Sequence, residues 1–129
     1  MKQSKQGSLE SIVLSLMRMV LGLTFSMHGA QKLLGFFGGK VVAYWSLMGL
    51  AGALELFGGL LLLAGLFTRP VAFVLSGMMA VAYFMAHAQG SFWPIENGGE
   101  LAVVYCFSFL YLSMSGAGRI SLDRILRKV

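Results

Sequence analysis

One carboxylate, that of Glu55, lies inside an otherwise uncharged apolar run of 21 residues, 47–67. Such a run is long enough to cross a bilayer, which requires about 20 helical residues. A carboxylate near the bilayer midplane costs about 2.5–3.5 kcal/mol on insertion scales, so Glu55 is expected to face protein and to have a partner. An ionisable group in that position predicts a functional site.

Depth in the membrane selects the side chains that can meet Glu55. At 1.5 Å per residue from the centre of each apolar run, Glu55 lies about 3 Å outward of the midplane. On the same count His28, Tyr83 and His87 lie about 5 to 10 Å outward. We therefore predict a cavity in the outer half of the membrane, lined by these four residues. Arg18 lies about 7 Å inward, and its long side chain is expected to close the cavity from below by pairing with Glu55.

Lys32 and Glu100 complete the set of candidate residues. Lys32 lies near the outer boundary, where an anchor that extends its ammonium group to the headgroups is favoured over a ligand contact. Glu100 stands at the start of the last apolar run, where the helix dipole favours a negative charge. A structural interpretation of Arg18 with Glu55 stays open, because a buried pair neutralises both charges and sets the register of two helices.

A quinone is the ligand that these groups suit best. A quinone ring needs hydrogen-bond donors for its two oxygens and apolar or aromatic walls, and His28, His87 and Tyr83 offer donors. A bis-histidine haem and a metal held by two histidines and a glutamate are chemically allowed, but no ligand-spacing motif supports either. No other cofactor is evident, since phosphate loops, dinucleotide fingerprints and hydrolase triads are absent. The catalytic residues, if any, are not identified.

Composition indicates an integral membrane protein. Hydrophobic residues make up 57% of the 129 residues and charged residues 12%, about half the share found in soluble domains. The net charge is +5, but the basic residues are not massed in one soluble patch, so nucleic acid is not an expected partner. The single cysteine, Cys106, excludes an intrachain disulfide and a cysteine-based metal cluster, and is expected to fill space in a helix.

The apolar segments predict an all-α fold, a bundle of four transmembrane helices forming one domain over 1–129. The segments run at about 9–34, 47–67, 70–89 and 100–114. Lysine and arginine gather on the side that the two termini share with the loop between the second and third segments. The positive-inside rule then places both termini in the cytoplasm. The last residues predict a short amphipathic helix on the membrane surface, with a frayed tail as the alternative; its apolar positions are Leu122, Ile125, Leu126 and Val129.

Small residues and a short repeat predict how the helices pair. Gly52 and Gly59 flank Glu55 and would let another helix approach closely. The run at 27–31, Met-His-Gly-Ala-Gln, resembles Met-Ala-His-Ala-Gln at 85–89. Two helical hairpins related by an axis along the membrane normal would produce this pattern. The same glycine-rich faces leave self-association of the protein open.

Several longer motifs resemble the DoxX family. One is Arg18-x-x-x-Gly22-x-x-Phe25-x-x-His28-Gly29-x-x-Lys32-Leu33, followed by Phe36-Phe37-Gly38-Gly39; a second is Leu50-Ala51-Gly52-x-x-Glu55-x-x-Gly58-Gly59-x-Leu61-x-x-x-Gly65-Leu66-x-Thr68-Arg69. The others are Phe92-Trp93-x-x-x-Asn97-Gly98-Gly99-Glu100 and Gly116-x-Gly118-x-x-Ser121-Leu122-Asp123. The resemblance implies a four-helix protein of the bacterial inner membrane. It also implies, through some relatives, a link to quinone-coupled thiosulfate oxidation or to complexes with redox partners.

The functional hypothesis is therefore a membrane subunit of a redox system that binds a quinone or a similar apolar molecule. In this hypothesis Glu55 and Arg18 form the floor of the cavity. His28 and His87 exchange protons or hydrogen-bond the ligand, and Tyr83 orients it. Two alternatives stay open: a transporter of small molecules or lipids, and a structural or assembly subunit without a ligand.

Overall fold

The computed structural model describes residues 2–127, with side chains from residue 7 onward. Every regular element in that range is helical, which confirms the all-α prediction. In chain order the elements are α1 (Lys2–Leu34), α2 (Leu47–Ala64), α3 (Thr68–Ala82), the π-helix η1 (Tyr83–His87), α4 (Pro94–Asn97), α5 (Glu100–Ser115) and α6 (Leu122–Leu126).

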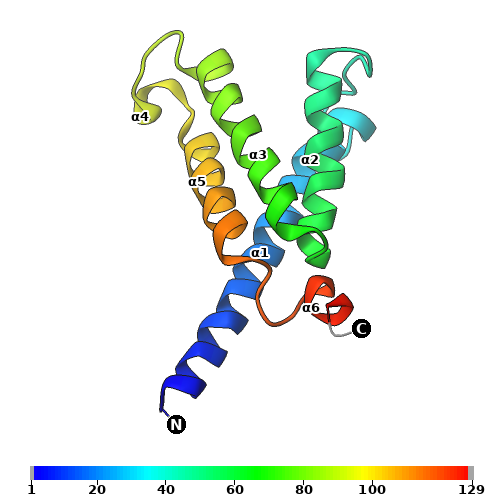
Figure 1. Ribbon diagram of the computed structural model, residues 1–129. Coiled ribbons are helices and arrows are strands. Elements are labelled where there is room, and N and C mark those ends of the chain that lie inside the picture. The colour runs from blue at the N-terminus through cyan, green and yellow to red at the C-terminus, as the bar shows by residue number, and fades with distance from the viewer. Residues whose placement is uncertain (1, 128–129) are drawn as a thin grey trace.

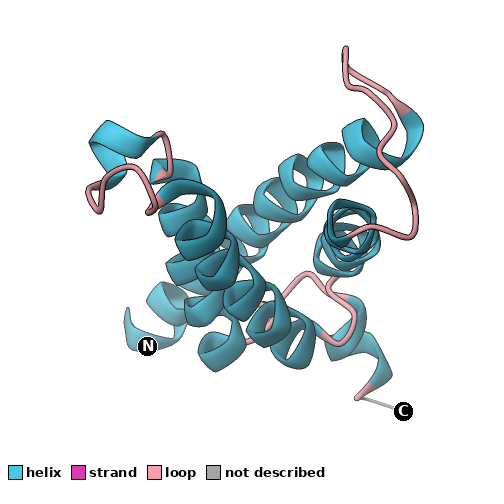
Figure 2. Ribbon diagram, turned by 90° about the horizontal axis from the view of Figure 1, so that it is seen from above, coloured by secondary structure: helices cyan, strands magenta, loops and turns pink. Residues whose placement is uncertain are grey.

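The long helices form two antiparallel hairpins. α1 packs mainly against α2, and α3 packs mainly against α5, while α2 and α3 share a smaller contact. The hairpins converge near the end of the bundle that holds both termini and diverge toward the other end (Figure 1). From above, they splay apart (Figure 2). This pairing agrees with the two hairpins expected from the short repeat.

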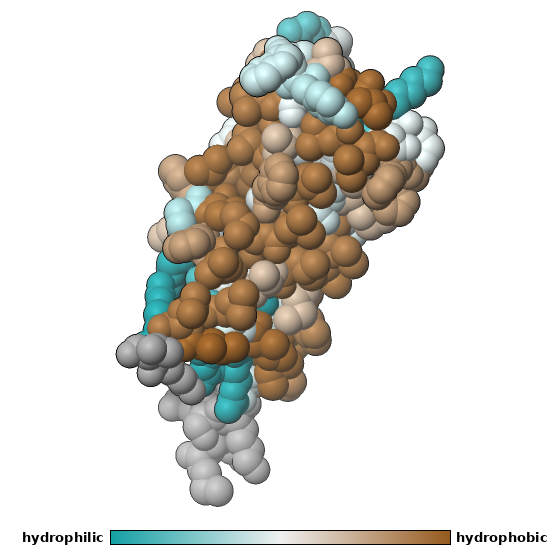
Figure 3. Space-filling model, turned by 90° about the vertical axis from the view of Figure 1, so that its right-hand side faces the viewer, coloured by the Kyte–Doolittle hydropathy of each residue, from teal (hydrophilic) through white to brown (hydrophobic). Residues whose placement is uncertain are grey.

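Among the described residues, three helices have the length and apolarity needed to cross a membrane: Gly7–Leu34, Leu47–Ala64 and Thr68–His87. The fourth, α5, has 16 residues, or about 24 Å, and is shorter than the hydrocarbon core of about 30 Å. Large apolar side chains face outward on all four helices. They cover the middle of the surface, with hydrophilic residues toward its two ends (Figure 3).

Helix bounds differ from the apolar runs for identifiable reasons. α1 begins at Lys2, well before the apolar run, because lysine and glutamine support helix formation as well as most apolar residues do. α2 ends at Ala64, three residues before the run does, because Gly65 adopts a left-handed conformation (φ 71°) and caps it. α5 begins at Glu100, as predicted. α6 confirms the short C-terminal helix, although Val129 lies outside the described residues.

Glycine allows the backbones of α1 and α2 to touch. A Cβ on Gly22 would lie 2.5 Å from the amide nitrogen of Leu63, and a Cβ on Gly29 would collide with the amide nitrogen of Leu56. Across the interface, a Cβ on Gly59 would lie 2.5 Å from the amide nitrogen of Ser26. No other residue type fits such contacts, so the predicted close approach beside Glu55 is confirmed.

Aromatic side chains join the two hairpins. Phe25 of α1 is 1% exposed and packs edge-on against two rings of α5, with centroid distances of 5.0 Å to Tyr105 and 4.9 Å to Phe109. These two rings stack on each other at 5.4 Å. The Tyr105 hydroxyl donates a hydrogen bond to the Thr24 hydroxyl at 2.8 Å. Such offset and edge-to-face contacts fix the angle between the hairpins.

Candidate functional site

A cavity of about 340 Å³ lies where the hairpins diverge, with lining residues from all four long helices. We call it the interhelical cavity. Its walls are largely apolar or aromatic and include Phe25, Met79 and Tyr105. Four predicted candidates also line it: His28, Lys32, Glu55 and His87. The combination of apolar walls with a few convergent polar groups is typical of small-molecule sites.

Lys32, not Arg18, is the partner of Glu55. The ammonium nitrogen of Lys32 lies 2.6 Å from one carboxylate oxygen of Glu55 and 2.8 Å from the other. The two side chains are 26% and 6% exposed, so the carboxylate is buried and the lysine reaches it from a partly open position. The interpretation of Lys32 as a membrane-surface anchor was therefore wrong. The pair neutralises both charges at the wall of the cavity.

Arg18 lies at the other end of the bundle and does not form the floor of the cavity. Its side chain is fully buried and donates to four backbone carbonyls: Nε to Ala117 at 2.9 Å, Nη1 to Leu62 and Leu63, and Nη2 to Ile120. The Leu62 and Leu63 carbonyls belong to the last turn of α2, where carbonyls lack helical partners and the dipole is negative. Arg18 therefore joins the end of α2 to the segment that follows α5. We call this cluster the arginine node.

The glycine contacts explain why the predicted pair is wrong. Antiparallel packing that places Gly22 beside Gly59, and Gly29 beside Gly52, sets Arg18 level with Leu62 and Leu63. Glu55 then lies about two helical turns, or about 11 Å, from that level. The sequence contained this signal in its glycine spacing, but depth estimates for single helices do not register two helices against each other. The estimated depths already placed Arg18 and Glu55 about 10 Å apart, so the error lay in expecting the long Arg18 side chain to bridge that distance.

The two histidines, whose places in the short repeat differ by one residue, both line the cavity but differ in their partners. The Nδ1 atom of His87 lies 3.2 Å from the carbonyl oxygen of Asn97. Because a carbonyl only accepts, Nδ1 carries the proton, and the other ring nitrogen of a neutral His87 is an acceptor. His28 makes no hydrogen bond to any part of the chain between residues 2 and 127, and its ring lies 6.2 Å from that of Tyr105.

His87 ends a π-helical turn, Tyr83–His87, at the end of α3. Such turns interrupt the α-helical phase and occur often at functional sites. The turn is closed by the Ala88 amide, which donates to the Tyr83 carbonyl at 2.9 Å. Tyr83 and His87, at the two ends of this turn, remain neighbours, with ring centroids 6.3 Å apart.

Tyr83 does not line the interhelical cavity, contrary to our expectation. Its side chain is 7% exposed, and its hydroxyl donates to the Phe92 carbonyl and accepts from the Asn97 amide at 3.0 Å. Asn97 also donates to the Ser91 carbonyl and accepts from the Gly99 amide, both at 2.8 Å. Tyr83 and Asn97 thus hold the loop between α3 and α5. In the sequence, Asn97 stood out only as a residue of the motif at 92–100.

Glu100 is the remaining candidate, and it also lies outside the cavity. It is exposed at the first position of α5, as its place in the sequence predicted, where the helix dipole favours its charge. Glu100 therefore acts at the start of α5, through the helix dipole, and not in the cavity. Tyr105, in contrast, lines the cavity but was not among the predicted candidates. Its hydroxyl and its contact with His28 were not predictable from spacing alone.

Comparison with known proteins places this architecture in a family. The DoxX family model matches residues 13–88, which is more than half of the chain. An uncharacterized protein of Haemophilus influenzae is 44% identical over 117 residues, covering 85% of this chain and 87% of that protein. The inner membrane protein YqjF of Escherichia coli is 30% identical over 132 residues, covering 93% and 96%. No solved structure matches significantly.

Long apolar helices that pair as hairpins, with ionisable groups between them, define an integral membrane protein. The family match adds the particular group: the chain belongs to the DoxX family. It is an integral protein of the inner membrane.

Proposed function

We propose that the protein binds a quinone, or an apolar molecule with similar oxygens, in the interhelical cavity. The observation that carries this proposal is the composition of the cavity, in which apolar and aromatic walls surround His28, His87 and the Lys32–Glu55 pair. A ring with polar oxygens fits these walls and groups, and it arrives from the lipid. In this proposal the protein is the membrane subunit of a redox system.

The hydrogen-bonding states of the residues suit both forms of such a ligand. The oxidised ring presents two acceptor oxygens, for which His28 and Lys32 supply N–H donors. The reduced ring presents hydroxyl donors, for which the acceptor nitrogen of His87 and the carboxylate of Glu55 are available. Reduction of a quinone takes up two electrons and two protons. Histidine is suited to passing such protons, because its charge changes near neutral pH.

The electrons in this proposal come from a partner protein. The chain has one cysteine, Cys106, and therefore cannot form a redox-active disulfide within itself. Transfer of electrons to the bound ligand requires a partner protein that docks near the cavity, on the side of the membrane that the cavity faces. With both termini cytoplasmic, as the distribution of lysine and arginine predicts, the cavity faces outward. Reporter fusions at the two termini test that orientation, and activity of a periplasmic reporter at either end would overturn it.

A transporter would need polar groups that continue across the bilayer. The buried arginine that could extend such a path is Arg18, and backbone carbonyls of α2 and of the segment 117–120 already accept from its nitrogens. A structural subunit without a ligand would need no group that remains free inside the cavity. His28 lines the cavity and has no hydrogen-bond partner within the described chain, so its ring nitrogens are available to a ligand, which favours binding over a purely structural role.

Quinone binding can be tested on the purified full-length protein. We expect quinone in lipid extracts of the protein, measured by mass spectrometry, and a rise in thermal stability on addition of a short-chain ubiquinone or menaquinone analogue. The Glu55→Gln and His28→Phe variants should lose this rise. Glu10→Gln is the matched control, since Glu10 is an exposed residue of α1 outside the cavity. No quinone in the extract, together with no stability change on addition, would overturn the proposal.

A further inference from the structure

A second cavity, of about 300 Å³, lies at the end of the bundle that holds both termini. It is bounded by the start of α3, the end of α5 and the C-terminal helix α6, and none of its lining residues lines the interhelical cavity. Its charged lining residues are Arg69, Arg124, Arg127 and Asp123. We call it the basic cavity. The proposed quinone function makes no use of it.

The one carboxylate of the basic cavity is already engaged by the protein. Asp123 accepts from the backbone amides of Phe67 at 2.8 Å and Thr68 at 2.9 Å, and so caps the start of α3. Burial alone would raise the pKa of Asp123, but these amides and the charge of Arg127 lower the pKa below its ordinary value. Asp123 therefore stays ionised at neutral pH. The three arginines leave the cavity with a net positive charge.

The arginines differ in how much of their hydrogen-bonding capacity the protein uses. Arg69 donates to carbonyls at the end of α5, those of Ser113 at 3.3 Å and of Met114, which orients its guanidinium at the rim. The side chains of Arg124 and Arg127 are exposed and make no hydrogen bond or ion pair within residues 2–127. Two guanidinium groups therefore present unused donors around one cavity, beside a third whose position is set. The planar donors of arginine match the oxygens of a phosphate.

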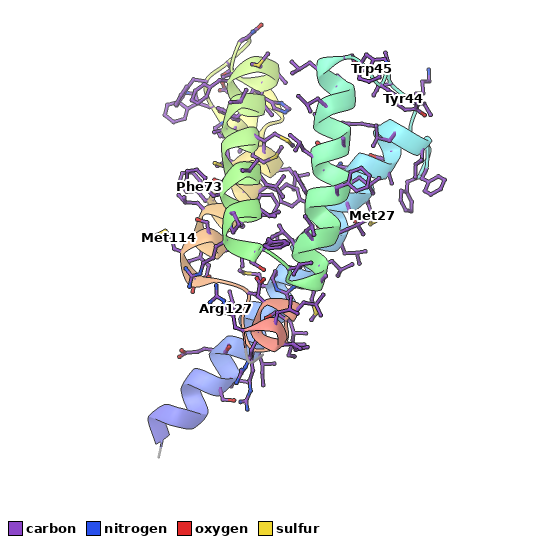
Figure 4. All side chains as sticks on the ribbon, turned by 45° about the vertical axis from the view of Figure 1, so that its right-hand side comes forward. Met27, Tyr44, Trp45, Phe73, Met114 and Arg127 are labelled. Atoms are coloured by element: carbon purple, nitrogen blue, oxygen red, sulfur yellow. The ribbon has the colours of Figure 1, made fainter. Side chains whose placement is uncertain are left out.

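Apolar side chains surround this basic cavity on the outside of the bundle. Phe67 is 62% exposed, Met114 74% and Ile125 60%, and all three lie on the elements that form the cavity. Met114 lies on the outer side of α5, toward the end of the bundle where Arg127 lies, and Phe73 lies farther up on the outer side of α3 (Figure 4). In a membrane, this surface faces the acyl chains near the level where α3 begins and α5 ends. The cavity thus lies where phospholipid headgroups lie.

We propose that the basic cavity binds the phosphodiester headgroup of an anionic phospholipid, in the leaflet on the side of the two termini. Arg124 and Arg127 contact the phosphate oxygens, and Arg69 closes the site from the bundle. Basic pockets at the ends of membrane helices are suited to such headgroups. A free phosphate offers the same oxygens, but the adjacent apolar surface favours a ligand that carries acyl chains. The bound headgroup links α6 to α3 and α5, so it also holds the C-terminal segment against the bundle.

The test compares lipids that differ only in the headgroup. Native mass spectrometry of the full-length protein in detergent would measure binding of phosphatidylglycerol and of phosphatidylcholine with the same acyl chains. We expect tighter binding of phosphatidylglycerol. Arg124→Gln and Arg127→Gln should each weaken it about fivefold, the factor that corresponds to about 1 kcal/mol per basic residue at an anionic leaflet. Binding of phosphatidylcholine should not change.

Arg119→Gln is the matched control, because it removes the same charge at the same end of the bundle from a residue that does not line the cavity. If this variant weakens phosphatidylglycerol binding as much as the other two do, the arginines act only through the net charge and the proposed site is wrong. Competition with inorganic phosphate distinguishes a lipid headgroup from a free phosphate ion as the ligand of this cavity. Full competition by millimolar phosphate would show a site for the free anion and overturn the assignment to a lipid.

A second measurement follows the C-terminal segment directly. Phosphatidylglycerol should slow proteolysis after Arg124 and Arg127, which lie on or beside α6, and phosphatidylcholine should not. In the Arg69→Lys variant, which keeps the charge but loses the planar donors, we expect intermediate protection. Equal cleavage rates with both lipids would mean that no headgroup holds α6, and would contradict the proposal even if some lipid binds elsewhere.

Discussion

The arginine node and the interhelical cavity each bury a charge in the membrane, and they satisfy it in opposite ways. Arg18 is fully buried, and its nitrogens donate to four backbone carbonyls. Glu55 is 4% exposed and depends on one side chain, that of Lys32, at the wall of a cavity. The first charge is held by groups that cannot move without unfolding a helix end. The second is held by a flexible lysine with space beside it.

The difference shows when a buried charge is structural and when it is available to a ligand. A guanidinium group has five donors, and the unpaired carbonyls at the end of a helix are natural acceptors for them. Four of the five donors of Arg18 are used in this way, so at most one remains for a ligand. A carboxylate held by one ammonium group keeps further acceptor positions, and the lysine can be displaced at moderate cost. Arg18 therefore stabilises the fold, whereas the Lys32–Glu55 pair is available to a ligand.

Replacement of Arg18 should have the largest effect on stability. Arg18→Met leaves the carbonyls of Leu63 and Ile120 without a donor, while those of Leu62 and Ala117 keep only the Gly65 amide and the Ser15 hydroxyl, at a cost of about 3–5 kcal/mol. We expect a large drop in the thermal unfolding temperature in detergent and faster proteolysis after residue 115. Arg18→Lys should recover part of the stability, since an ammonium group can meet only some of these carbonyls. Wild-type stability of Arg18→Met would show that the node is not structural.

Gly29 lies on the same helix as Arg18 but at the level of the cavity. Gly29→Ala places a methyl group against the backbone of Leu56, one residue from Glu55, and should cost about 1–3 kcal/mol while displacing α2. Gly77→Ala is the matched control, because nothing lies within 4 Å of its added methyl group. Gly77→Ala should be neutral or stabilise the helix by up to about 1 kcal/mol. Equal unfolding temperatures for the two variants would contradict the close contact of α1 with α2.

Glu55→Gln should affect ligand binding more than folding. The variant leaves the ammonium group of Lys32 without its counter-charge, but Lys32 is partly exposed, so the cost should be about 1–3 kcal/mol, below that of Arg18→Met. Adding Lys32→Met should recover part of this loss, and a double-mutant cycle measures the coupling. Additive effects of the two substitutions would show that the pair contributes nothing to stability.

Asp123 should give the smallest effect, and one that depends on pH. Its pKa is lowered in the folded protein, so its contribution to stability is present above the ordinary value of about 3.9 and disappears as the pH falls through the folded value. At pH 7 we expect Asp123→Asn to cost about 1 kcal/mol, as is usual for loss of a helix cap. The difference from wild type in thermal unfolding should narrow below pH 4. A constant difference between pH 3 and pH 7 would contradict an ionic cap.

The sequence carried enough information for the fold and for half of the site. Apolar runs of about 20 residues with a charged carboxylate among them leave few alternatives to membrane helices, because the cost of exposing such surface to water, or such a charge to lipid, is large. His28, Glu55 and His87 were correctly placed together because depth along a helix follows from its rise per residue. Tyr83 was wrong because its hydroxyl bonds to the Phe92 carbonyl and the Asn97 side chain of the following loop, contacts that helix spacing does not predict.

What the sequence determined by itself was the kind of environment, and what the tertiary structure decided was the partner of each charge. Hydropathy and length act on each helix separately, so they identify Glu55 and Arg18 as buried groups that require partners. The choice between Lys32 and Arg18 depends on how two helices are registered, and backbone contacts at Gly22, Gly29 and Gly59 set that register. A shift of two turns, about 11 Å, separates a ligand site from a structural node.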